Sequence, residues 1–81
     1  MFRISVHFRP VSDTNEFELG NVFALLIDGV QIQPKDLKLS EAKTITFNYH
    51  RLTFGDNPKK QLGTVVFNAD DIVYIDMTQD D

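Results

Sequence analysis

The chain of 81 residues has no cysteine, so neither a disulfide framework nor a thiolate metal site can stabilise it. It also has no tryptophan, and its four glycines are scattered singly, which excludes a glycine-rich loop for binding phosphate. A hydrophobic core must therefore come from aliphatic side chains, seven phenylalanines and two tyrosines. A chain of this length buries only about 60–65% of its unfolded surface. We therefore expect one small domain over residues 1–81 with a thin stability margin.

Long hydrophobic runs are also absent. The longest, residues 22–27, is far shorter than the roughly 20 residues that a membrane-spanning helix needs. Residues 1–3 lead directly into an alternating pattern rather than into the apolar region of a signal peptide. These features predict a soluble, cytoplasmic protein that has no membrane partner.

Catalytic motifs are missing as well, since the chain contains no HExxH, GxSxG or Walker pattern. His7 and His50 are the only histidines; both fall on the polar face of a predicted strand, where they could be neighbours across a sheet. Asp70 and Asp71 are adjacent, so on an extended chain they point to opposite faces and do not form a carboxylate pair. We expect no enzyme, with no catalytic, cofactor-binding or metal-binding residue.

Two strand-like runs meet at Asp28-Gly29. An Asp-Gly pair predicts a two-residue type I′ hairpin between residues 22–27 and 30–33. Because the first arm has no polar residue, it is predicted to be a central strand with both faces covered. Gly20-Asn21 directly before it predicts a bulge or bend.

Period-two alternation of apolar and polar residues predicts further strands at residues 2–9, 44–54, 61–68 and 72–77. The phase of the alternation slips near His50-Arg51, which predicts a β-bulge there. We expect a polar loop at residues 11–16 and a frayed tail at residues 78–81. Residues 34–43 fit a short edge strand, one helical turn or a loop, and strand or irregular structure is favoured.

These patterns predict an all-β fold of five to seven mostly antiparallel strands with little or no helix. The alternatives are a small barrel and a compact β-sandwich. A barrel is preferred because it leaves no exposed sheet edges.

Residues 62–75, LGTVVFNADDIVYI, resemble the second conserved motif of the Sm and Sm-like RNA-binding family: a strand, a tight turn and a short strand. The resemblance implies an SH3-like or Sm-like small barrel. Asn68-Ala69 stands where that family has Arg-Gly, the arginine of which helps to hold RNA. The resemblance therefore implies the fold but not RNA binding.

Acidic residues are concentrated in the last quarter of the chain: residues 61–81 contain five aspartates and no lysine or arginine. The net charge of the whole chain is −4. We interpret this end as a surface for a protein partner with a basic surface, as in an inhibitor that mimics the charge of nucleic acid. Solvated charges and turn aspartates are the alternative. The candidate residues are Asp70, Asp71, Asp76 and Asp80.

Two further functions stay open at this point. One is binding of single-stranded nucleic acid by basic side chains with aromatic neighbours. Its candidate residues are Arg3, Arg9, Arg51, Lys59 and Lys60. The other is a structural role as a homo-oligomer that assembles through strand edges.

Overall fold

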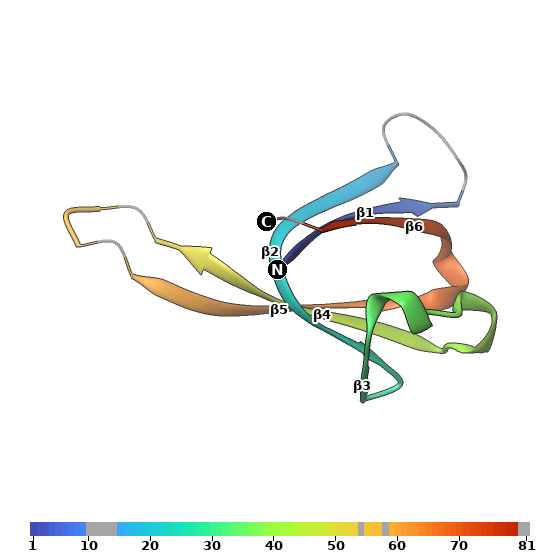
Figure 1. The fold of residues 1–81 in the computed structure, drawn as a ribbon. Coiled ribbons are helices and arrows are strands. Elements are labelled where there is room, and N and C mark those ends of the chain that lie inside the picture. The colour runs from blue at the N-terminus through green and yellow to red at the C-terminus, as the bar shows by residue number, and fades with distance from the viewer. Residues whose placement is uncertain (10–14, 54, 58, 80–81) are drawn as a thin grey trace.

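The computed structural model describes residues 1–9, 15–53, 55–57 and 59–79. In these ranges the chain forms a six-stranded sheet in which all pairs are antiparallel, and no α-helix is present (Figure 1). The strands are β1 (Phe2–Phe8), β2 (Glu16–Ile27), β3 (Val30–Ile32), β4 (Thr44–Leu52), β5 (Lys60–Asn68) and β6 (Ile72–Gln79). The all-β prediction and its strand number are confirmed. No helix in these ranges is long and apolar enough to cross a membrane.

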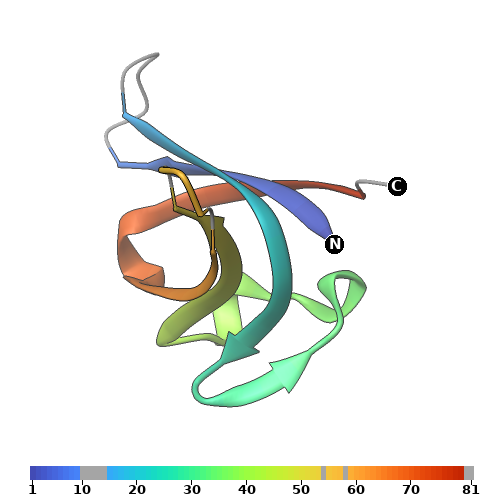
Figure 2. The same ribbon diagram turned by 90° about the vertical axis from the view of Figure 1, so that its left-hand side faces the viewer.

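The strand order is β5-β4-β2-β1-β6, and β3 also pairs with β2. The first half of β2 pairs with β1, and its second half pairs with β3 and β4. Figures 1 and 2 show that β2 curves strongly between these partners, so the sheet folds over on itself with β1 and β6 on one side and β4 and β5 on the other. The predicted central position of residues 22–27 is confirmed.

Two bulges in β2 accompany this curvature. The first lies at Gly20-Asn21, where the register with β1 shifts by one residue and Asn21 has a φ of 57°. This bulge was predicted from the sequence. The second lies at Phe23, where the register with β4 shifts by one residue. A bulge increases the local twist and bends a strand. The two bulges therefore explain how β2 can pair with β1 on one side of the folded sheet and with β4 on the other.

The bulge predicted at His50-Arg51 is wrong, because β4 pairs with β5 without interruption from Thr44 to Leu52. The end of this hairpin projects beyond the rest of the molecule as an arm (Figure 1). Arg51 lies on the arm and is exposed. Away from the core, side chains have nothing apolar to pack against, so apolar and polar residues need not alternate along the strand. A polar residue can therefore stand where an apolar one is expected, without any shift in strand register.

The core is one cluster of side chains from both sides of the folded sheet. Its buried members are Phe2, Ile4, Val6, Val22, Leu25, Ile45, Phe47, Ala69 and Ile72. The prediction that both faces of residues 22–27 are covered is wrong at Phe23, which is 41% exposed. The bulge turns Phe23 outward, where its ring stacks on His50 with 4.5 Å between centroids.

The segment at residues 34–43 forms two 3₁₀ turns, η1 (Pro34–Asp36) and η2 (Leu39–Glu41), with residues of no regular structure after each. The predicted edge strand is wrong, while the irregular structure and the helical turn each hold for part of the segment. Pro34 is at the start of η1, a position where its fixed φ and missing N–H carry no penalty. Leu37 and Leu39 pack against the core from these turns.

The strand–turn–strand motif at residues 62–75 is confirmed, with a third 3₁₀ turn, η3 (Ala69–Asp71), between β5 and β6. The side chain of Asn68 accepts a hydrogen bond from the backbone N–H of Asp70 at 3.3 Å. The predicted fraying is wrong for residues 78 and 79, which pair with β1. Residues 80–81 and most of the predicted loop at residues 11–16 lie outside the described ranges.

The Asp28-Gly29 hairpin is confirmed, since the two residues have φ values of 50° and 85°, as a type I′ turn requires. The carboxylate of Asp28 also accepts hydrogen bonds from the backbone N–H groups of Lys43 at 3.0 Å and Thr44 at 2.8 Å. The turn is thereby tied to the beginning of β4. The bond from Thr44, then that from Lys43, lowers the pKa of Asp28 below its usual 3.8.

This contact predicts an acid-dependent stability difference between the wild type and Asp28→Asn. Asparagine keeps the turn and one acceptor oxygen but lacks the charge. Because the folded-state pKa of Asp28 is depressed, the charge stabilises the fold above 3.8, and this contribution is lost as the pH falls through the folded-state value. Thermal unfolding measured at neutral pH and near pH 2 should show a higher melting temperature for the wild type only at neutral pH. An equal difference at both pH values would contradict the role of the charge.

Candidate functional site

The outward side of β1 and of its two neighbours, β2 and β6, carries a group of polar side chains, four of which contact one another. Ser5 pairs with Glu18 on one side and Asp76 on the other, and His7 pairs in the same way with Glu16 and Tyr74. Residues directly opposite each other share a face of the sheet. We call this surface the polar face; it comprises Arg3, Ser5, His7, Glu16, Glu18, Tyr74, Asp76 and Thr78.

His7 is held in place on three sides within the polar face. Its Nε2 atom lies 3.1 Å from Ser5 Oγ, and its Nδ1 atom lies 3.4 Å from a carboxylate oxygen of Glu16. Its ring stacks on Tyr74 with 4.1 Å between centroids. With the proton on Nδ1, the imidazole donates to Glu16 and accepts from the Ser5 hydroxyl. This is the order of groups in a serine–histidine–acid triad.

The electrostatics around Ser5 favour binding of a cation over acyl transfer. Acyl transfer needs hydrogen-bond donors aimed at a developing oxyanion. Here the neighbours of Ser5 in register are the carboxylates of Glu18 and Asp76, which would repel that charge. The same two groups attract positively charged side chains, and Arg3 of this chain lines a concavity with them. The contacts of Ser5, His7 and Glu16 therefore lie on the same face as the carboxylates of Glu18 and Asp76.

A concavity of about 210 Å³ lies beside Ser5. It is lined by Arg3, Ile4, Ser5, Glu18, Asp76 and Thr78. Pockets for small molecules usually have roughly 300–1,000 Å³, so this one fits a single side chain better than a free ligand. In the described ranges, no group of three or more histidine, aspartate or glutamate side chains is arranged to hold a metal ion.

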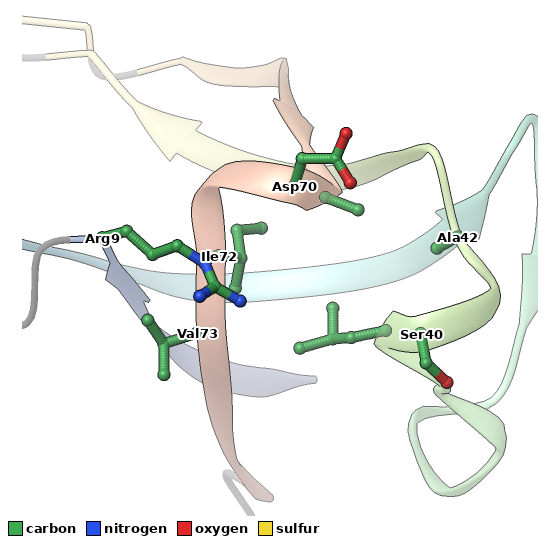
Figure 3. Close-up of a pocket in the computed structure, with 8 residues that line it drawn as sticks. Arg9, Ser40, Ala42, Asp70, Ile72 and Val73 are labelled. Atoms are coloured by element: carbon green, nitrogen blue, oxygen red, sulfur yellow. The ribbon is translucent and has the colours of Figure 1, made fainter.

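The candidate aspartates occupy different places. Asp76 lies on the polar face, whereas Asp70 and Asp71 are exposed in η3, before β6 begins. Asp70 lines a second concavity of about 350 Å³. Figure 3 shows this concavity with Arg9 on one side and Ser40 on the other. Asp80 lies outside the described residues.

The candidate basic residues are also divided. Arg3 lies on the polar face, where its guanidinium group approaches Gly20, and Arg9 follows β1. Arg51, Lys59 and Lys60 are exposed together on the arm formed by β4 and β5. Each concavity with a candidate aspartate thus also contains an arginine, Arg3 in one and Arg9 in the other.

The expectation that His7 and His50 are neighbours is wrong. His7 is on β1 and His50 on β4, and β2 lies between these strands. His50 instead stacks on Phe23, and its Nδ1 atom is buried without a hydrogen-bond partner.

Five residues of the polar face were not singled out from the sequence: Ser5, Glu16, Glu18, Tyr74 and Thr78. The two glutamates alternate with Phe17 and Leu19, the same signal that identified the other strands. Because residues 11–16 were predicted to be a loop and the strand was predicted from residue 22, the two glutamates were not placed on a face. Continuing the alternation back to Glu16 would have found them.

Comparisons with models of protein families, with curated proteins and with solved structures found no match to this chain. Function is therefore inferred from the geometry of the chain's own surfaces.

Proposed function

We propose that the protein is a non-enzymatic binding module that recognises a basic segment of a protein partner through the polar face. The observation that supports this most directly is the row formed by Glu18, Ser5 and Asp76 across three adjacent strands. Its two carboxylates border a concavity with room for one long side chain. An arginine or lysine that entered it would form charge-assisted hydrogen bonds with both.

The rest of the polar face suits the same ligand. Glu16 adds a third carboxylate in the next row, so the face carries a net charge of −2 after Arg3 is counted and with His7 neutral. Tyr74 is exposed, and its ring can contact a second cation. Complementary charge of this kind speeds association and selects basic partners. An inhibitor of a nucleic-acid-binding protein is one function of this class.

The test is binding of a fluorescent oligo-arginine peptide to two charge-matched variants. The variant Glu18→Gln/Asp76→Asn removes the two carboxylates beside Ser5, and Asp70→Asn/Asp71→Asn removes two from η3. We expect the first to weaken binding about tenfold, because two close charges are lost. The second should change the affinity little. Fluorescence anisotropy at low salt measures both.

Both variants have the same net charge, so a general effect of charge on the peptide cancels between them. Equal weakening would contradict the proposal that the polar face is the binding surface. Capture of partners from the native lysate with the wild type and with Glu18→Gln/Asp76→Asn then identifies which proteins depend on this face.

A further inference from the structure

β5 is one end of the strand order, so one of its edges has no partner strand among the residues that the structure describes. Natural sheets protect such edges with charged residues, prolines or bulges. β5 has none of these from residue 61 to residue 68, and its nine residues pair with β4 in an unbroken register. It therefore offers a regular, uncharged edge to another strand.

β6, at the other end of the sheet, is different. Its register with β1 shifts by one residue near Val73, and the charged Asp76 lies in its middle. Both features oppose the addition of a strand. The contrast indicates that the edge of β5, rather than that of β6, is suited to an intermolecular contact.

The outward side chains of β5 strengthen this assignment. Leu62 is 75% exposed and Val66 is 59% exposed, with Thr64 between them on the same face. These side chains stand on the face of β5 opposite to Val65 and Phe67, which pack against the core, so a second chain can approach the edge from the outside without meeting the core.

We propose that β5 pairs with β5 of a second copy of this chain, antiparallel and about a two-fold axis at Thr64. In this register Leu62 of each copy lies opposite Val66 of the other, and the two Thr64 residues face each other. Pairs of aliphatic side chains directly opposite each other stabilise antiparallel strands. The arrangement buries both exposed aliphatic residues of β5 and closes the sheet edge.

The charges at the two ends of β5 favour a second copy in this orientation. Lys59 and Lys60 lie at its beginning, and Asp70 and Asp71 follow its end in η3. Antiparallel pairing places the basic end of one copy beside the acidic end of the other, twice by symmetry. Parallel pairing would bring lysine beside lysine and aspartate beside aspartate.

Disulfide cross-linking tests the register, because the chain has no cysteine of its own. Thr64→Cys should form a disulfide-linked dimer on mild oxidation, since facing residues in an antiparallel pair have Cα atoms about 4.5–5.5 Å apart. Leu62→Cys should not, because the two copies of residue 62 would be about 14 Å apart at ~3.4 Å per residue. Equal cross-linking of the two variants, or none with Thr64→Cys, would overturn the proposal.

Sedimentation equilibrium provides a measurement that needs no covalent bond. We expect the wild type to form a dimer whose population rises with protein concentration. Leu62→Lys should raise the dissociation constant of this dimer about tenfold, because one substitution removes the same contact at two symmetry-related places. Val30→Lys is the matched control, since Val30 is 65% exposed on β3. A strictly monomeric wild type, or equal weakening by both variants, would refute the dimer. Neither outcome bears on the polar face, which contains none of these residues.

Discussion

Phe47→Ala is expected to lower the free energy of unfolding by about 3–5 kcal/mol. Phe47 is the largest fully buried side chain, with 0% exposure, and it lies in β4 between Leu25 of β2 and Val65 of β5. Its ring also meets the ring of Phe67 edge-on. A domain of this length has a total stability of roughly 4–12 kcal/mol, so this single substitution should remove a large part of it.

Phe23→Ala is the matched control for this prediction. Phe23 is on the neighbouring strand β2, but the bulge turns it outward, so its removal should cost only about 1 kcal/mol. Urea unfolding followed by circular dichroism gives both values. Similar losses for Phe23→Ala and Phe47→Ala would contradict the assignment of inward and outward faces at the bulge.

The second large effect is expected at Gly63, which lies directly opposite Tyr49 in the pairing of β4 with β5. The tyrosine ring covers the glycine, and a Cβ atom built on Gly63 would lie 2.7 Å from Cε1 of the ring and closer to Cζ. Gly63→Val must therefore displace the ring of Tyr49 or the backbone of β5. We expect a loss of about 1–3 kcal/mol, the usual cost of overpacking.

A double-mutant cycle separates this clash from any general effect of a side chain at position 63. In the background Tyr49→Ala the ring is absent, so Gly63→Val should cost much less or stabilise the strand through its higher β-propensity. The measurement is again the free energy of unfolding in urea. Equal costs in the two backgrounds would show that the ring does not determine the requirement for glycine.

Local patterns in the sequence predicted the strands well, because alternation and turn chemistry act over a few residues. The type I′ turn at Asp28-Gly29 and the bulge at Gly20-Asn21 are examples. The bulge at Phe23 could not be predicted in the same way. A continuous apolar run looks the same whichever side each residue faces, and only pairing with β4 decides that Phe23 points outward.

The candidate site was predicted only in part, for a related reason. Counting charges identified Asp76 but grouped it with Asp70 and Asp71, which are its neighbours in sequence. Glu18 is far from Asp76 in the chain. The two flank Ser5 because β1 lies between β2 and β6 in the sheet. Strand order depends on long-range contacts that no local pattern contains.

The curvature of β2 affects how the protein unfolds. Its first half carries part of the polar face, and its second half pairs with the beginning of β4, from which the arm extends, so the two regions share one continuous backbone. Both halves of the sheet also pack into one core, since Ile4 and Val6 of β1 and Phe47 of β4 belong to the same buried cluster, so opening either half would expose apolar side chains of the other. We therefore expect cooperative, all-or-none denaturation, with the most slowly exchanging amide protons in β2.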